Sequence, residues 1–451
     1  MKIVIIGGVA AGAKAAAKSR RMLSDAEIHI YTEDTNVSYS ACGFPYYIEG
    51  NFEDWKKLLI RSIDEFEKSN INIHLQQKAT RILPVDKKVI IKELQTGEEK
   101  FVSYDKLVIA TGSKPFIPEG LNTSLENVYA LKTVEDCISL RTKMREAEHI
   151  ALIGGGYISI ELLEALIKNN KKVTMIEKTP FVLPVFDEDI SSLVQNYILE
   201  NSNGLCRIIP SDEVNEFVGK DKITGVLTKS GIGFEADLAI ISTGVVPNVE
   251  LAEASGIEIG VTGAIKVNSR MQTNFPDIYA CGDCTEKFNI ISNEPAWLSL
   301  GSIANKEGRV AAINVCGETE DFEGILGSTV TRFLNLNISM SGLSEKAAKS
   351  AGFDAVNVIV TQKDKASYMP EVKNITLKLV ADRRSHRVLG IQAIGLGDAD
   401  KRVNTVSVGL MQRILVEDLL DIDLTYSPPF STSTDILHTA ARILYSKMMG
   451  K

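Results

Sequence analysis

The stretch KIVIIGGVAAG (residues 2–12) decides the fold, because an apolar run ends in two glycines and continues into an alanine-rich segment. We interpret it as a buried strand, a glycine turn and the start of a helix, which form the first half of a β-α-β unit in a parallel sheet. A second strand, EIHIY, follows and is expected to end at Thr32 or Glu33. The basic start and apolar run also fit a secretion signal, but the second strand favours the β-α-β unit, so we expect a cytoplasmic location.

The same pattern occurs a second time. HIALIGGGYIS (residues 149–159) again joins a strand to a glycine turn and a helix, and KVTMIEK (residues 172–178) supplies the next strand. A short strand with a similar ending follows each unit, at residues 107–115 and 238–247. From about residue 324 the sequence alternates like strands and then becomes helical. We therefore expect an α/β protein with two Rossmann-like dinucleotide-binding domains and a C-terminal α+β domain.

The two glycine turns have the chemistry that a pyrophosphate needs. Free backbone N–H groups at a helix N-terminus bind its negative charge, and glycine lets the backbone turn sharply and approach closely. Each turn departs from the G-x-G-x-x-G pattern at one glycine, yet two copies in matching contexts are a stronger signal than one. The residues expected to bind the two cofactors are Gly7, Gly8, Ala10, Ala11 and Gly12 in the first turn and Gly154, Gly155, Gly156, Tyr157 and Ile158 in the second.

An acidic residue at the end of the strand after each turn is expected to bind a ribose hydroxyl. In the second unit this residue is Glu177, and it favours NADH over NADPH because a 2′-phosphate would meet a carboxylate. In the first unit Glu33 and Asp34 both fit. The alternative is that these acids are solvated strand ends.

Composition excludes several classes of function. The chain has 451 residues and a formal net charge of −8 without a polybasic run, which allows two or three domains and counts against nucleic acid as the main partner. No apolar stretch is long enough to cross a bilayer.

The six cysteines are scattered, unlike a secreted disulfide framework. Cys281 and Cys284 have the spacing of a dithiol or half a zinc site, but no second ligand pair accompanies them, so we interpret them as packing residues and expect no metal.

Seven motifs carry a resemblance to a known family: the first glycine turn, SYSACGFPYYIEG, ATGSKP, GGGYISIE, STGVVPN, IYACGDC and TYSPPFS. They span nearly the whole chain, which resembles the flavoprotein disulfide reductases, also called pyridine nucleotide-disulfide oxidoreductases. The resemblance implies a homodimer whose chain has three domains. These are an FAD-binding domain of two segments (residues 1–115 and 243–323), an inserted NAD(P)H-binding domain (116–242) and a C-terminal dimerisation domain (324–451).

The resemblance also implies roles around the flavin. Asp283 is expected to hold the FAD ribitol, and Gly301 is expected to lie near the flavin ring. Thr111 and Gly112 are expected along the FAD, and Gly244 of STGVVPN is expected among the cofactor-binding residues. The resemblance also implies that Glu33 contacts the ribose. Related enzymes usually carry the ribose-binding acid at the position of Thr32, so the neighbouring Glu33 is expected to replace it.

Cys42 is the expected redox centre. Disulfide reductases of the glutathione type carry C-x-x-x-x-C, but the second position here is Tyr47. Cys42 therefore needs a disulfide partner from outside, or it cycles through sulfenic acid. Within the family the sequence is most similar to coenzyme A-disulfide reductases, in which the partner is coenzyme A in a mixed disulfide. We expect the helix that follows to lower the pKa of the thiol through its dipole.

Three groups of residues bear on the substrate. Lys14, Lys18 and Arg21 share one helix face beside the first glycine turn, and by resemblance they hold coenzyme A phosphates; a solvated helix face is the alternative. Ser38 is expected to contact the substrate with them. By the same resemblance, Tyr368 and Tyr426 reach over the cysteine of the second subunit, where a phenol could protonate a leaving thiolate; together with Cys42 they are the expected catalytic residues.

The leading hypothesis is an NAD(P)H-dependent reductase of coenzyme A disulfide or a related persulfide. Tyr157 is expected to shield the flavin until NADH displaces it. One alternative is an NADH oxidase, although relatives that use a histidine to reduce peroxide or oxygen carry it where this chain has Ala10. Another alternative is a reductase of a small electron-transfer protein, which would need neither Cys42 nor the tyrosines.

Overall fold

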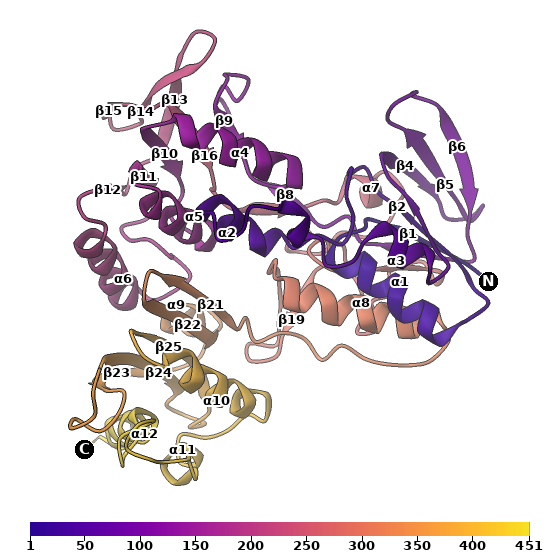
Figure 1. Cartoon of the computed structure of the whole chain (residues 1–451). Helices are drawn as coiled ribbons and strands as arrows, with labels where there is room; N and C mark the ends of the chain where they lie inside the picture. Colours follow the sequence, from indigo (N-terminus) through magenta and orange to yellow (C-terminus); the bar gives the residue numbers. More distant parts are fainter. Residues whose placement is uncertain (451) are drawn as a thin grey trace.

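The computed structural model describes residues 1–450 and has a mixed α/β architecture with three sheet-centred units. Figure 1 shows the first unit on the right, the second at the upper left and the C-terminal unit below the second. This arrangement confirms the predicted fold class of two parallel-sheet units and an α+β unit.

The first unit is built on the predicted β-α-β pattern. Its five strands are all parallel, in the order β18-β7-β1-β2-β3 (Ile278–Ala280, Lys106–Ile109, Lys2–Ile6, Glu27–Tyr31, Ile71–His74). β2 ends at Tyr31, earlier than the sequence suggested, and Thr32 N–H donates one further hydrogen bond to His74 O, at the end of β3, at 3.0 Å. Helices α1 (Ala10–Met22) and α8 (Gly301–Val315) lie side by side on the sheet.

The second unit repeats this plan. Its parallel strands have the order β12-β11-β10-β16-β9 (Cys206–Pro210, Lys172–Glu177, His149–Ile153, Leu238–Ile241, Val128–Ala130). The helices of this unit are α4 (Val134–Glu146), α5 (Tyr157–Lys168) and α6 (Glu188–Asn201). Apolar strands buried on both faces are typical of such parallel sheets.

The chain leaves the first unit through β8 (Ser113–Pro115) and returns through β17 (Val245–Pro247), and these two strands pair antiparallel. β18 and α8 then complete the first unit, so this unit is built from two chain segments. The exact domain boundaries stay a prediction.

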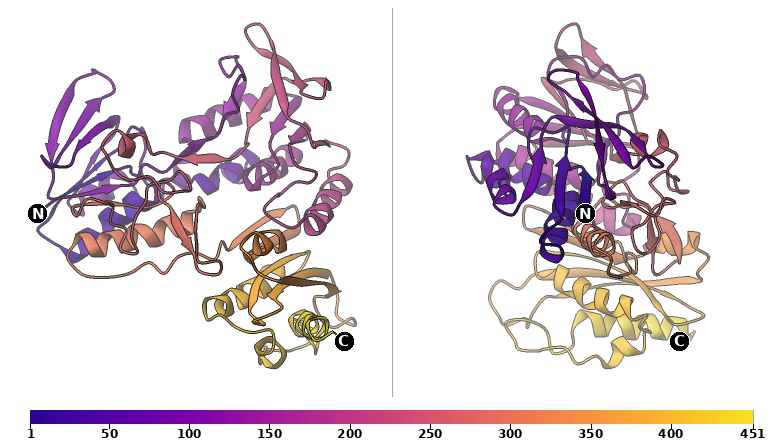
Figure 2. Two further views of the ribbon diagram at one scale, coloured as in Figure 1. Left: turned by 180° about the vertical axis from the view of Figure 1, so that it is seen from behind. Right: turned by 90° about the vertical axis from the view of Figure 1, so that its right-hand side faces the viewer.

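The C-terminal unit is an antiparallel sheet covered by helices. The strand order is β21-β22-β25-β24-β23 (Thr329–Phe333, Leu336–Gly342, Val388–Gly395, Asn374–Asp382, Ala355–Lys363). Four helices belong to it: α9 (Glu345–Ser350), α10 (Ala399–Met411), α11 (Asp418–Asp421) and α12 (Ile436–Met448). Figure 2 shows this unit from two further sides as a separate layer below the two parallel-sheet units.

Smaller elements complete the chain. Two three-stranded antiparallel sheets project from the parallel sheets: β4-β5-β6 (Gln77–Leu83, Lys88–Glu93, Glu99–Ser103) and β13-β14-β15 (Val214–Gly219, Ile223–Thr228, Gly233–Glu235). The other elements are η1 (Ala41–Gly43), α2 (Phe44–Glu49), η2 (Trp55–Leu58), α3 (Ile63–Glu67), α7 (Glu250–Glu253), β19 (Lys287–Asn289) and β20 (Glu294–Ala296). Among the described residues, every helix is too short or too polar to span a bilayer.

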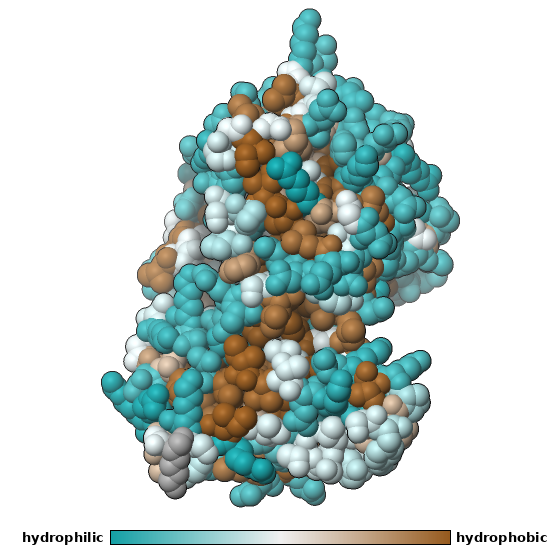
Figure 3. Space-filling model, turned by 90° about the vertical axis from the view of Figure 1, so that its left-hand side faces the viewer, coloured by the Kyte–Doolittle hydropathy of each residue, from teal (hydrophilic) through white to brown (hydrophobic). Residues whose placement is uncertain are grey.

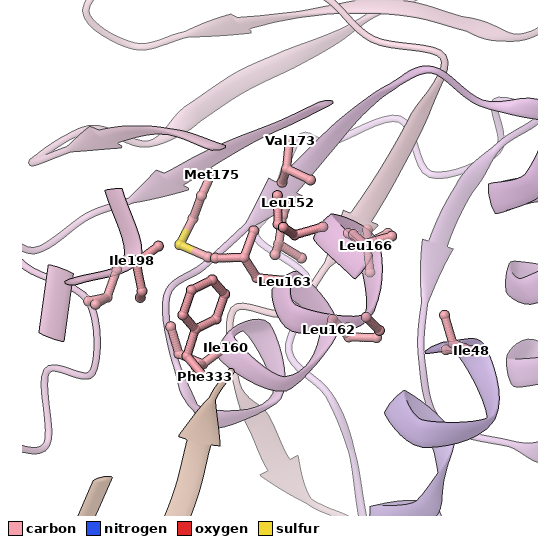
Figure 4. Packing of buried hydrophobic residues seen from close by; sticks show 14 of the residues in the cluster. Ile48, Leu152, Ile160, Leu162, Leu163, Leu166, Val173, Met175, Ile198 and Phe333 are labelled. Carbon is pink, nitrogen blue, oxygen red and sulfur yellow. The ribbon is translucent and has the colours of Figure 1, made fainter. Parts of the chain in front are cut away.

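One hydrophobic core joins all three units. It is centred on α5 and on the strands of the second unit, and it also receives Ile48 from α2 and Phe333 from β21. Figure 4 shows Ile48 facing Leu162, while Phe333 lies beneath Leu163. The short helix that follows Cys42 is therefore packed against the second unit.

Candidate active site

The first glycine turn fits a close backbone approach. Gly7 has φ +103°, and a Cβ there would lie 2.1 Å from Ala110 O. A Cβ on Gly12 would lie 2.0 Å from Gly7 O, so only glycine fits at either position without a backbone shift. Ala10 and Ala11 form the first turn of α1, and no side chain caps this N-terminus. Its N–H groups remain available to an anion.

The second turn has the same geometry. Gly154 has φ +102°, and a Cβ there would lie 2.3 Å from Ser242 O. Nothing lies within 4 Å of a Cβ on Gly156, which precedes α5, and no side chain caps that helix either. Ile158 is exposed, whereas burial raises the pKa of Tyr157 to about 12. The Tyr157 hydroxyl lies 2.5 Å from Thr329 Oγ1, so this ring links the turn to the C-terminal unit.

The carboxylates expected at the ribose hydroxyls already have protein partners. Glu177 is buried, and its Oε2 accepts from Gly155 N–H at 2.6 Å. Its Oε1 accepts from Thr179 N–H at 2.9 Å and from Thr179 Oγ1 at 2.8 Å. Glu33 is exposed and forms an ion pair with Lys78 at 2.7 Å. Burial raises the pKa of Asp34. Which of these acids binds ribose stays a prediction.

Of the residues predicted around the flavin, Thr111 and Gly112 follow β7 and Asp283 follows β18, so these three lie beyond the carboxyl ends of two neighbouring parallel strands. Asp283 Oδ2 accepts from Ser113 Oγ at 3.1 Å and from Ser299 Oγ at 2.5 Å. Thr111 Oγ1 donates to Asn248 O at 2.8 Å, which ties the two crossing segments together. Gly112 and Gly244 have positive φ, and Gly301 starts α8; a Cβ on any of the three would meet open space.

Lys132 is a neighbour of this region that no sequence motif indicated. It follows β9 of the second unit, yet the carboxylates of Asp283 and Asp34 lie close enough to its ammonium group to favour a higher pKa. Burial lowers the pKa of Lys132 despite these two charges. Lys132 lies near these two carboxylates only because the chain crosses from the first unit to the second and back.

Cys42 is exposed in η1 and is separate from the other cysteines of the chain. Cys281 and Cys284 are fully buried, as their interpretation as packing residues requires. Tyr47, five residues after Cys42, is also buried. In the described part of the chain, no three His, Cys, Asp or Glu side chains gather as metal ligands.

The expected lowering of the Cys42 pKa was wrong. Surrounding protein withholds water from the thiol although the residue is exposed, and this desolvation raises its pKa. The carboxylates of Glu161 and Asp283 raise it further. α2 has only six residues and offers a small dipole against these effects. Glu161, in the motif GGGYISIE, was missed as a neighbour of the cysteine; it accepts from Thr331 Oγ1 at 3.2 Å.

The basic face of α1 is present as predicted. Lys14 and Lys18 are half-buried and Arg21 is exposed, and within residues 1–450 their side chains form no ion pair or hydrogen bond. Arg20, by contrast, donates to the oxygen of the C-cap residue Leu23 at 3.2 Å, and it also donates to Ala26 O at 2.6 Å and Asn70 O at 2.7 Å. The predicted stripe is therefore distinct from the arginine that the fold uses.

Ser38 is buried and has φ +53°. Its N–H donates to Gly8 O at 2.8 Å, and its carbonyl oxygen accepts from Ile60 N–H at 2.8 Å. The first bond joins the segment that carries Cys42 to the first glycine turn, and the second joins it to the chain after η2.

The two predicted tyrosines lie on the C-terminal unit, and the single chain does not bring them to Cys42. Tyr368 is 74% exposed in the connection between β23 and β24, and Tyr426 is 52% exposed before α12. Figure 1 shows the β23–β24 connection at the lower left, away from α2. Figure 3 shows the side of α6 and β23, where apolar side chains gather on both the upper and the lower part of this face.

Residues 1–307 match the family model described as pyridine nucleotide-disulphide oxidoreductase, and residues 328–436 match the dimerisation domain of the same family. The chain belongs to this family. It is therefore an oxidoreductase that uses FAD and NAD(P)H and carries the family's dimerisation domain.

Curated relatives of this oxidoreductase match over nearly its whole length. An NAD(P)H sulfur oxidoreductase (CoA-dependent) of Pyrococcus abyssi is 34% identical, with 98% of both chains covered. An NADH oxidase of Methanocaldococcus jannaschii is 31% identical, with 100% of both covered. A coenzyme A disulfide reductase of Staphylococcus haemolyticus is 29% identical, covering 97% of this chain and 98% of the relative. Among solved structures, an NAD-dependent persulfide reductase from A. fulgidus has a TM-score of 0.96 and 34% identity, covering 100% of this chain and 84% of that one.

The residues of this family member fit its two cofactors. Three helix N-termini, those of α1, α5 and α8, lack a side-chain cap, and each begins at or beside a predicted cofactor residue. The open space at Gly112, Gly156, Gly244 and Gly301 would be narrowed by any side chain. Uncapped helix starts beside open glycines are the arrangement that dinucleotide phosphates require.

Proposed function

We propose that this enzyme reduces coenzyme A disulfide, or a persulfide or polysulfide of coenzyme A, at the expense of NAD(P)H and through Cys42. The observation that carries the proposal is the exposed, solitary thiol: Cys42 has Tyr47, rather than a second cysteine, five residues further on. A thiol without an internal partner forms its disulfide with a molecule from outside.

The reaction begins when the Cys42 thiolate attacks one sulfur of coenzyme A disulfide. A Cys42–coenzyme A disulfide forms and one coenzyme A thiolate leaves. FAD, when bound, supplies the two electrons from NAD(P)H that reduce this mixed disulfide. The second coenzyme A then leaves and the Cys42 thiolate is restored. Overall, NAD(P)H, one proton and the disulfide give NAD(P)⁺ and two coenzyme A thiols; a coenzyme A persulfide would give one thiol and hydrogen sulfide.

The residues of the chain have defined tasks in this proposal. Lys14, Lys18 and Arg21 bind the phosphates of coenzyme A, since their charges are unpaired within the described residues. Tyr368 and Tyr426 of the partner subunit in a homodimer cover Cys42 and protonate the leaving thiolate. Their high exposure in the single chain supports a role across an interface. The names of the Pyrococcus and Staphylococcus relatives support coenzyme A as the carrier of sulfur.

A second candidate is an NADH oxidase, because a relative named NADH oxidase is 31% identical over the full chain. Cys42→Ser separates the two functions. A disulfide reductase loses its activity with coenzyme A disulfide in this variant, whereas direct oxidation of the reduced flavin by oxygen remains.

The deciding experiment is the intact mass of the purified protein, denatured without reductant and then treated with dithiothreitol. The proposal predicts a thiol-sensitive increment equal to coenzyme A that is absent from Cys42→Ser. An unmodified or singly oxygenated Cys42, together with no turnover of coenzyme A disulfide, would contradict it. Arg21→Ala tests the pocket: KM for coenzyme A disulfide should rise while KM for NADH stays constant.

A further inference from the structure

The helix that follows Cys42 is held by side chains from the second unit. α2 belongs to the first unit by chain order but packs against α4 and α5. At its C-terminal end, Lys168 Nζ donates to Glu49 Oε1 at 2.9 Å and Asn169 Nδ2 donates to Glu49 O at 3.0 Å. The helix that directly follows the thiol is therefore fixed by side chains of the second unit.

Arg141 of α4 makes the most extensive of these attachments. Its guanidinium carbon lies 4.2 Å from the centre of the Tyr47 ring, which is buried on α2. Nη1 donates to Phe52 O at 3.3 Å and Glu53 O at 3.4 Å, and Nη2 donates to Glu53 Oε1 at 2.9 Å. The planar guanidinium of Arg141 thus contacts an aromatic ring of α2 and donates hydrogen bonds to the chain directly after α2.

Because the guanidinium of Arg141 is buried, we expect it to hold α2 and the residues after it in place, and not only to form a surface ion pair with Glu53. The Arg141 side chain is 7% exposed, whereas that of its carboxylate partner Glu53 is 79% exposed and would be solvated without it. A buried guanidinium is tolerated only where its donors are bonded, and here most of those bonds go to backbone. The C-cap residue of α2 is Gly50, which has φ +98°, and Arg141 Nη2 lies 3.8 Å from the position that a Cβ would take there.

We propose that Arg141 is a positioning residue for Cys42: its contacts with Tyr47 and with the carbonyls of Phe52 and Glu53 fix α2 and thereby place the thiol for disulfide exchange. This inference rests on the proposed function of Cys42. A movement of α2 would be passed on to Cys42 directly, because α2 begins two residues after Cys42.

The expected effect follows from the length of α2. Six helical residues span about 9 Å, so a tilt of roughly 10° about one end moves the other end by about 1.5 Å. Misplacement of a reacting group by about 1 Å costs on the order of 100-fold in rate. Loss of the Arg141 contacts should therefore lower the rate of steps at Cys42 by roughly 10- to 100-fold.

The test compares Arg141→Met with Arg145→Met in the full-length enzyme loaded with FAD. Arg145 is the matched control, because it lies on the same helix, is 65% exposed and approaches Glu53 Oε2 only to 3.8 Å. We expect Arg141→Met to lower kcat with coenzyme A disulfide and to shift the pH profile of Cys42 alkylation by iodoacetamide. Anaerobic reduction of the flavin by NADH should stay within about 2-fold of the wild type. If Arg141→Met matches Arg145→Met in turnover and in the alkylation profile, the proposal is wrong.

A second pair of variants decides the question if Arg141→Met fails to fold or to bind FAD. Tyr47→Phe keeps a ring beneath the guanidinium and should behave like the wild type, whereas Tyr47→Leu should lower turnover and shift the alkylation profile. Equal behaviour of the two Tyr47 variants overturns the proposal. If the wild type does not reduce coenzyme A disulfide, the proposed function fails, and the alkylation profiles alone then decide the role of Arg141.

Discussion

Substitution of Lys378 by methionine should destabilise the junction between the second unit and the C-terminal unit. Lys378 on β24 is 1% exposed, and its ammonium contacts Asp189 at 2.7 Å, Asp187 at 3.1 Å and Glu345 at 3.2 Å. Asp187 and Asp189 belong to the second unit, whereas Glu345 starts α9. Burial alone would lower the pKa of Lys378, but the carboxylates outweigh burial and raise it.

The magnitude depends on which carboxylate would be left without water. Asp189 and Glu345 are partly solvated, but the Asp187 side chain is only 7% exposed. Asp187 would keep hydrogen bonds from Gln392 Nε2 at 2.7 Å and from Glu345 N–H at 2.9 Å. Breaking a buried pair costs about 3–5 kcal/mol, and these remaining bonds reduce the expected loss to about 2–4 kcal/mol.

The assay is calorimetric unfolding at pH 7 of the wild type, Lys378→Met and the control Lys349→Met. A loss of about 2–4 kcal/mol corresponds to a fall in Tm of roughly 5–15 °C for the affected transition. Lys349 is 59% exposed and pairs with the same Glu345, so its loss should cost at most about 1 kcal/mol.

The pH dependence supplies a second check. Burial would raise the pKa of Glu345, but Lys349 and Lys378 outweigh burial and lower it below 4.5. A carboxyl whose pKa is lowered by folding stabilises the protein above its unfolded value and loses this contribution as the pH falls through the folded value. The difference between the wild type and Lys378→Met should therefore narrow below about pH 4.5. Equal Tm values for the two lysine variants, or a difference that widens in acid, would refute this account.

Three further predictions follow from the first unit and its surroundings. Glu161→Gln removes a charge that raises the pKa of Cys42, so alkylation of Cys42 at pH 7 should accelerate about 3- to 10-fold; an unchanged rate would contradict this contact. Gly12→Ala places a Cβ 2.0 Å from Gly7 O and should yield protein with little bound flavin, measured by visible absorbance; a normal flavin content would disprove the tight turn. Burial lowers the pKa of His74 from 6.5 to about 4, so stability should fall as the pH drops between these values. His74→Phe should flatten that dependence in denaturant titrations, and an unaltered slope would exclude His74 as its source.

The sequence predicted features that depend on local patterns. Each glycine turn is a contiguous motif that the sequence shows directly, although the atoms that exclude a Cβ at Gly7 and Gly154 belong to the distant Ala110 and Ser242. The fold class followed from the repetition of that motif along the chain. Cys42 was found in the same way, since its motif is contiguous.

Contacts between units were beyond such reasoning. Lys132 and Arg141 carry no motif, and their partners lie far away in the sequence, so only the crossing of the chain between units brings them together. The pKa of Cys42 was predicted in the wrong direction because desolvation and the Glu161 carboxylate depend on packing, whereas the helix dipole was read from sequence alone. Tyr368 and Tyr426 depend on a second subunit, and their roles stay a prediction.

The shared core also limits how this protein can be taken apart or recombined. Residues 116–242 look like a self-contained cassette along the chain, yet the apolar face of α5 is covered by Ile48 from α2 and Phe333 from β21. A fragment cut at those boundaries would expose that face to water and would be prone to aggregate. Chimeras that exchange the nucleotide preference between relatives should therefore transfer α2 and β21 together with the inserted segment.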